Sequence, residues 1–199
     1  MPWLTYPAIV ALSRSLTGTE SVFEFGSGGS TLWFAERVGH VVSIEGDKDW
    51  HDNLQPRLPD NATLVHHHFS DVEGYLGQLA KATHERGAFD VVLVDGGADR
   101  SRACELAAEA LKPSGLIILD NSDVEGHAPG VAQLHDDSAF RRIDFHGPGP
   151  VAHYVWCTSF FFKDCARWIG GDGPILPRPI HEQGEIEIWD PAFAGRMVD

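Results

Sequence analysis

A glycine-rich segment, residues 24–31, is followed by an acidic residue, Glu45, about twenty positions further along the chain. Glycines let a ligand approach the backbone closely, because no Cβ intrudes, and they permit the positive φ angles of a tight turn. A helix that begins directly after such a loop presents free N–H groups to a negatively charged group. A carboxylate at Glu45 can accept hydrogen bonds from both hydroxyls of a ribose. The two motifs together predict the binding of a nucleoside-containing cofactor.

Three cofactors use this arrangement: NAD, FAD and S-adenosylmethionine. The dinucleotide fingerprint places a third glycine three residues after the second, and Thr31 occupies that position here. The lack of a glycine at this position disfavours the close helix packing that the pyrophosphate of NAD or FAD requires. A glycine-rich turn without any ligand is the other interpretation, and the match between the loop and Glu45 disfavours it.

Asp95, Asp120 and Asn121 stand at the ends of two predicted parallel strands. Their oxygens could converge on a hard divalent cation such as Mg²⁺, which prefers oxygen ligands. The alternative is that Asp95 contacts the cofactor, whereas Asp120 and Asn121 close the strand and cap the next segment.

Histidines offer two further kinds of chemistry. His66 and His68 share one face of a strand and, with Asp71, could hold a transition metal; a polar strand end near an adenine pocket is the favoured interpretation. His127 follows the fifth strand and is a candidate general base, since the pKa of a free histidine lies near neutrality. An exposed loop histidine is the equally weighted alternative for His127.

The elements that must position these residues follow from the hydrophobic pattern. Apolar runs alternate with amphipathic stretches, which is typical of a sheet with helices on both faces. The segment 90–95 (DVVLVD) has a continuous apolar centre rich in β-branched valine, as expected of a buried parallel strand. The expected strands are 21–25, 41–45, 63–67, 90–95 and 116–120, and the expected helices are 30–38, 49–54, 72–82 and 102–112.

The last part of the chain has a different pattern. The strands expected at 140–145 and 153–162 are separated by a loop, 147–150, and no helix, so they should pair as an antiparallel hairpin. Residues from 164 onward are rich in glycine and proline. We therefore expect one domain over 1–163, and a tail over 164–199 that packs on this domain or extends from it.

Composition excludes several classes of partner. The chain has 199 residues and a formal net charge of −14, which repels phosphate backbones and anionic lipids. Nucleic acids and membranes are therefore not expected as partners. Three cysteines without a CxxC pair fit a reducing compartment, and no basic, apolar leader is visible. These features predict a cytoplasmic protein with a small-molecule substrate, and they leave a homo-oligomer open.

In these motifs the sequence resembles the class I S-adenosylmethionine-dependent methyltransferases. The resemblance covers roughly residues 20–121, in order and at the spacing of that family, and the predicted hairpin also fits. It implies a Rossmann-like α/β fold: a doubly wound sheet of seven strands in the order 3-2-1-4-5-7-6, mostly parallel with an antiparallel last strand. The matching segments are 24–31 (EFGSGGST), 42–47 (VSIEGD), 90–96 (DVVLVDG) and 111–121 (LKPSGLIILDN).

The resemblance also implies roles for individual residues. The glycine loop would hold the methionine part of S-adenosylmethionine, with Ser30 or Thr31 bonding its carboxylate, and Glu45 would take the ribose hydroxyls. Ser70 and Asp71 would lie near the adenine, and Asp95 beneath the sulfonium. The residues implied for the methionine part are Glu24, Gly26, Ser27, Gly28, Gly29, Ser30 and Thr31.

Asp95, Asp120 and Asn121 look like the metal ligands of the catechol-type O-methyltransferases, in which a metal orients the acceptor hydroxyl and lowers its pKa. Those enzymes carry a basic lysine three residues after the first aspartate. Here Ala98 holds that position, and Arg100 nearby stays protonated and cannot serve as the base.

The function expected from the sequence is methyl transfer from S-adenosylmethionine to an unidentified small-molecule acceptor, with O-methylation favoured. Asp95 and His127 are the candidate catalytic residues, and a divalent cation is a candidate second cofactor. A non-catalytic S-adenosylmethionine-binding protein is the first alternative. A nicotinamide-dependent oxidoreductase is the second, and Thr31 disfavours it.

Overall fold

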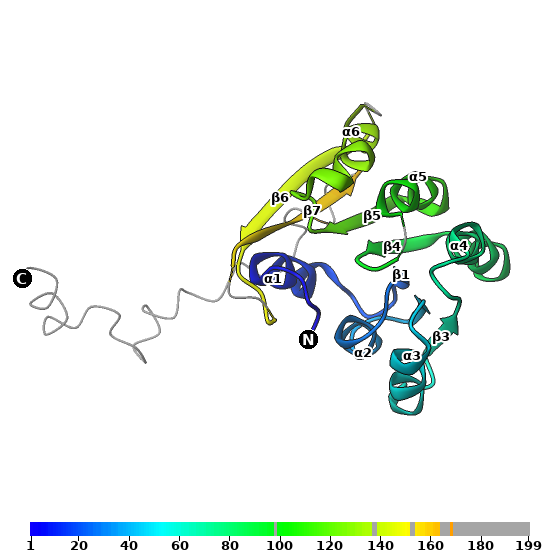
Figure 1. Ribbon diagram of the computed structural model, residues 1–199. Coiled ribbons are helices and arrows are strands. Elements are labelled where there is room, and N and C mark those ends of the chain that lie inside the picture. Colours follow the sequence, from blue (N-terminus) through cyan, green and yellow to red (C-terminus); the bar gives the residue numbers. More distant parts are fainter. Residues whose placement is uncertain (98, 137–138, 152–153, 164–167, 169–199) are drawn as a thin grey trace, which may run out of the picture.

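The computed structural model describes residues 1–97, 99–136, 139–151, 154–163 and 168. Seven strands form one sheet in the order β3-β2-β1-β4-β5-β7-β6 (Figure 1). The pairs of β7 with β5 and with β6 are antiparallel, and the other pairs are parallel. The predicted fold class and strand order are therefore confirmed. The strands are β1 (Ser21–Phe25), β2 (His40–Glu45), β3 (Ala62–His66), β4 (Phe89–Val94), β5 (Leu111–Asp120), β6 (Arg141–Gly147) and β7 (Trp156–Phe162).

Helices cover both faces of this sheet. None of the helices in the described ranges combines the length and the apolar character needed to cross a bilayer. The helices are α1 (Tyr6–Ser15), α2 (Gly29–Ala35), α3 (Lys48–Leu54), α4 (Val72–Arg86), α5 (Arg100–Ala110) and α6 (Ala128–Asp136), with short 3₁₀ turns η1 (Gln55–Arg57) and η2 (Glu125–His127).

The central strands are apolar on both faces because each face is covered. Phe23 and Val92 pack into the core beneath α4 and α5. Their neighbours in sequence, Val22 and Val91, point the other way into the core beneath α1 and α2. All six residues of β4 are buried, which explains the apolar run from Val91 to Val94 in the sequence.

Strand β5 begins earlier than predicted. The residues before Leu116 were expected to end the preceding helix and to form a turn, but β5 starts at Leu111 and the helix ends at Ala110. Pro113 explains the early end of the helix, because a proline disfavours helical backbone at the residue before it. The pairing with β4 is irregular between Phe89 and Val91, where the chain absorbs this extra segment.

Helix α6 has no counterpart in the sequence prediction. It buries only Gly130 and Leu134, and the Pro129-Gly130 pair near its start is typical of a turn, which hides the helix in the sequence. Gly130 lets α6 approach α5 closely, because a Cβ at this position would lie 2.8 Å from the Cα of Ser101.

The predicted hairpin is confirmed as β6 and β7, although β7 starts at Trp156 and residue 153 lies outside the described residues. Trp156, Phe160 and Phe162 are buried. The proposed tail, 164–199, also lies outside the described residues except for Trp168. That side chain is buried, and its indole N–H donates to the carbonyl of Ser114 over 2.8 Å.

Candidate active site

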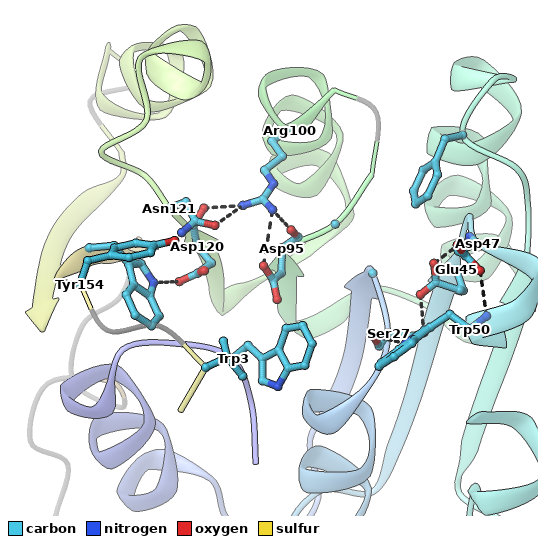
Figure 2. Close-up of a pocket in the computed structure, with 15 residues that line it drawn as sticks. Trp3, Ser27, Glu45, Asp47, Trp50, Asp95, Arg100, Asp120, Asn121 and Tyr154 are labelled. Carbon is cyan, nitrogen blue, oxygen red and sulfur yellow. Dashed lines mark hydrogen bonds and ion pairs between the residues drawn. The ribbon is translucent and has the colours of Figure 1, made fainter. Parts of the chain in front are cut away.

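A cavity of about 510 Å³ opens at the carboxyl ends of the parallel strands (Figure 2). Residues that follow β1, β2 and β3 line one end, and residues that follow β4 and β5 line its middle and other end. This is where ligands bind in open α/β sheets. The lining residues are Trp3, Gly26, Ser27, Glu45, Asp47, Trp50, Phe69, Asp95, Gly96, Arg100, Asp120, Asn121, Val151, Tyr154 and Trp156.

Two glycines make the floor of the cavity. Gly26, at the end of β1, has a φ of +100°. A Cβ on Gly26 would lie 2.9 Å from the backbone nitrogen of Gly96, and a Cβ on Gly96 would lie 2.7 Å from the Cα of Gly26. The ends of β1 and β4 can therefore approach this closely only because neither Gly26 nor Gly96 has a side chain. The lack of these side chains also leaves the cavity open at this point.

The rest of the glycine loop lines a smaller cavity of about 30 Å³ beside the first. Ser27, Gly28, Gly29 and Ser30 contribute to its wall, and Asp95 reaches both cavities. The loop thus offers backbone groups and small polar side chains along a continuous surface that ends at Asp95.

Glu24 and Thr31 lie beneath the loop and do not line either cavity. The Thr31 hydroxyl donates to Glu24 Oε2 over 2.7 Å and accepts from the Gly28 N–H over 3.0 Å, and the Ser43 hydroxyl also donates to Glu24. Burial raises the pKa of the Glu24 carboxyl above its ordinary value. These hydrogen bonds hold the glycine loop in place from beneath. Glu24 and Thr31 therefore affect a ligand indirectly, through the conformation of the loop.

Glu45 ends β2 and is buried at the edge of the cavity. Its Oε2 accepts a hydrogen bond of 2.6 Å from the Ser27 hydroxyl, and its Oε1 accepts one of 2.9 Å from the Asp47 N–H. The carboxylate is therefore held in place beside the glycine loop, as a group that binds ribose hydroxyls must be.

Two aromatic residues that the sequence analysis did not single out lie near Glu45. Trp50 donates its indole N–H to the carbonyl of Ser27 over 3.0 Å, and its ring lies 6.1 Å from the ring of Trp3. Phe69 packs against Gly46, where a Cβ would lie 2.4 Å from the ring. Both rings are partly exposed and line the cavity. In the sequence, their position shortly after the second and third strands is the signal that could have marked them.

Ser70 and Asp71 do not line the cavity, although Phe69 just before them does. The Ser70 hydroxyl pairs with His68, and Asp71 caps α4 through the N–H of Gly74 and contacts His67. Among the described residues, no group of three or more His, Cys, Asp or Glu donors within reach of one ion includes a residue of 66–71.

The other end of the cavity lies at β5 and β7. Asp120 is buried, and its Oδ1 accepts hydrogen bonds from the Trp156 indole over 3.0 Å and from the Thr158 hydroxyl over 2.6 Å. The ring of Tyr154 lies 5.7 Å from that of Trp156. This end therefore combines aromatic walls with a fixed carboxylate.

Asp95 lies between the two ends, with its carboxylate pointing into the cavity (Figure 2). Burial and the negative charge of Asp120 raise the pKa of Asp95, the positive charge of Arg100 lowers it, and the result is a pKa of about 7. Asp95 can therefore hold or release a proton near neutral pH.

The sheet brings Asp95, Asp120 and Asn121 together as expected, but the guanidinium of Arg100 lies among them (Figure 2). It donates to the backbone carbonyls of Asp95 and Asp120 and to the side-chain oxygen of Asn121. Because a permanent positive charge occupies the position between these oxygens, the arrangement does not fit a divalent cation.

His127 lies in η2, behind the loop that follows β5, and does not line the cavity. Its Nδ1 is 2.8 Å from the carbonyl oxygen of Asn121. His127 therefore touches the backbone of a cavity residue and does not itself reach the cavity.

Comparisons with known proteins agree with this geometry. No curated protein sequence matches the chain. Solved structures that share the fold include an O-methyltransferase from Bacillus cereus in complex with SAH, with 19% identity over 79% of this chain and 78% of that one and a TM-score of 0.60. A precorrin 8w decarboxylase from Methanobacterium thermoautotrophicum is 20% identical over 79% of this chain and 88% of that one, with a TM-score of 0.56. A methyltransferase from Pyrococcus furiosus is 20% identical over 79% of this chain and 81% of that one, with a TM-score of 0.54. The family model described as "Methyltransferase domain" matches residues 23–122, from β1 to the loop after β5. The chain therefore belongs to the class I S-adenosylmethionine-dependent methyltransferases.

Proposed function

We propose that the protein transfers a methyl group from S-adenosylmethionine to a hydroxyl group of a small aromatic molecule. The observation that supports this proposal is one continuous cavity with Glu45 and the glycine loop at one end, aromatic walls at the other, and Asp95 between them. A donor at the first end would present its reacting group beside Asp95, toward an acceptor at the second.

The donor end fits S-adenosylmethionine. The Glu45 carboxylate would accept the ribose hydroxyls, and Gly26 to Ser30 would follow the methionine part along the loop. Glu24 and Thr31 would hold that loop in shape from below. Trp50 and Phe69 would flank the adenine, with Ser70 and Asp71 shaping the turn that presents Phe69.

When bound, S-adenosylmethionine supplies a methyl group on a sulfonium sulfur, which becomes a neutral thioether once the acceptor oxygen holds the methyl group. Asp95 would accept the proton of the acceptor hydroxyl, a role that suits a carboxyl whose pKa of about 7 is near the working pH. His127 would act indirectly, by holding the backbone carbonyl of Asn121.

The acceptor end favours a small aromatic molecule over a polymer. Trp3, Val151 and Tyr154 are exposed side chains that line the cavity, and exposed apolar groups gathered at one cavity mark a site for an apolar ligand. The net charge of −14 opposes a nucleic-acid acceptor. O-methylation is also the activity named for the Bacillus cereus structure that shares the fold.

Calorimetry with S-adenosylmethionine tests the donor site. The wild type should bind it, and Glu45→Ala should weaken binding by at least about tenfold, since a charged hydrogen-bond partner contributes roughly 1.5–3 kcal/mol. Glu109→Ala, on the exposed face of α5, is the matched control and should bind as the wild type does. Binding of NADH in place of S-adenosylmethionine would contradict the proposal.

The acceptor is tested separately, by release of S-adenosylhomocysteine with a panel of phenols and of matched aliphatic alcohols. We expect turnover with phenols only. Turnover confined to amines or to aliphatic alcohols would contradict the aromatic hydroxyl acceptor and leave the donor assignment intact.

A further inference from the structure

Arg100 contacts each of the three residues that the sequence offers as metal ligands. Its Nη1 is 2.7 Å from the carbonyl oxygen of Asp120 and 3.2 Å from Oδ1 of Asn121. Its Nη2 donates to the carbonyl of Asp95 and lies 3.5 Å from the Asp95 carboxylate. One guanidinium thus contacts all three residues at the ends of β4 and β5.

Local structure explains how Arg100 reaches this position. Asp99 caps α5 by accepting from the N–H of Arg102, so Arg100 is the first residue of the helix. Helical side chains lean toward the N-terminus of their helix, and Figure 2 shows the Arg100 side chain descending between Asn121 and Asp95. The side chain is 17% exposed, which indicates that its charge is largely enclosed by the site.

Two of the side-chain oxygens that a cation would need already accept hydrogen bonds. Asn121 Oδ1 accepts from Arg100, and Asp120 Oδ1 accepts from Trp156 and Thr158. A hard cation prefers several oxygen ligands. Here it would have to displace these donors and lie against a guanidinium, whose charge cannot be removed by deprotonation.

We propose that Arg100 takes the place of the divalent cation in this pocket, and that the site works without a metal. Arg100 is then a positioning residue: it offsets the negative charge of Asp95 and Asp120 and orients Asn121. This inference deepens the proposed function, and it rests on that function only for the identity of the reaction. The absence of a metal can be tested by itself, because metal binding is measured without S-adenosylmethionine or an acceptor.

Electron paramagnetic resonance of free Mn²⁺ tests this proposal directly. The wild type should not bind Mn²⁺ at this site. Arg100→Gln removes the charge and keeps an amide donor, and it should bind Mn²⁺ at least about tenfold more tightly than the wild type. Arg100→Lys keeps the charge and should behave as the wild type does, which separates charge from packing.

Asp95→Asn in the Arg100→Gln background identifies the site, because it should abolish the gained binding. Among the described residues, Asp144, His146 and Cys157 form a separate group of donors within 4.8 Å of one another, and binding there would survive Asp95→Asn.

Wild-type Mn²⁺ binding that Asp95→Asn abolishes would overturn the proposal, even if no Arg100 variant folds. Equal binding by folded Arg100→Gln and Arg100→Lys proteins would also overturn it. A failure to bind S-adenosylmethionine would instead contradict the proposed function and leave the Mn²⁺ result standing.

Discussion

At the scale of single residues, the site depends on how charges are paired. Glu45 and Asp120 have hydrogen-bond donors on their carboxylates, and Asp95 has its carboxylate facing the cavity beside Arg100. Asp95 is thus the carboxyl whose protonation state should respond most directly to a cationic ligand.

The raised pKa of Asp95, about 7, predicts how donor binding depends on pH. Ionised Asp95 attracts a sulfonium and protonated Asp95 does not, so affinity for S-adenosylmethionine should fall by about tenfold from pH 8 to pH 6. Calorimetry at several pH values measures this dependence of binding.

The raised pKa of Asp95 also affects folding. Because the folded protein disfavours ionised Asp95, the contribution of this residue to the free energy of unfolding should decrease as pH rises from the ordinary carboxyl range to about 7.

Asp95→Asn is the control for this pH dependence, because it removes the titrating group and retains a similar shape. The variant should bind S-adenosylmethionine more weakly, with a flat pH profile. An unchanged profile in this variant would assign the pH dependence to another group.

At the scale of elements, close approach of backbones decides where glycine is required. Gly77 lies in the interior of α4, and a Cβ there would meet nothing within 4 Å, whereas a Cβ on Gly130 of α6 would press on the backbone of Ser101. The two glycines are therefore expected to respond in opposite directions to the same substitution.

Gly77→Ala should raise the free energy of unfolding by about 0.5–1 kcal/mol, because alanine loses less backbone entropy in a helix. Gly130→Ala should lower it by about 1–3 kcal/mol, because it overpacks the contact between α5 and α6. Urea denaturation of the two variants beside the wild type measures both changes. A change of the same sign in the free energy of unfolding of both variants would show that helix propensity, and not the contact with Ser101, determines the effect of Gly130→Ala.

At the scale of the whole molecule, the strand order could be predicted because the motifs occur in sequence at the ends of strands. The glycine loop, Glu45 and Asp95 each follow an apolar run, and parallel strands bring their carboxyl ends to one edge. The family match over 23–122 covers the same region.

The direction of side chains in the turns could not be predicted in this way. Whether Phe69 or Ser70 faces the cavity depends on the path of the turn after β3, and the position of Arg100 depends on how Asp99 starts α5. Helix α6 was missed because the Pro129-Gly130 pair near its start resembles a turn, and its packing against α5 is visible only in the fold. These details come from tertiary packing, which a linear pattern does not contain.

The contact between Trp3 and Trp50 gives the protein an internal optical probe. The two indoles lie 6.1 Å apart at the cavity, and one of them is bonded to the backbone of the glycine loop. A ligand that enters there would change the polarity around both fluorophores, so S-adenosylmethionine should shift the tryptophan emission of the wild type. Trp50→Phe should reduce this shift, whereas Trp168→Phe, on a tryptophan buried against Ser114, should keep it. Titration by fluorescence would then report occupancy of the pocket without any labelled compound, and an identical response from Trp50→Phe would place the signal elsewhere.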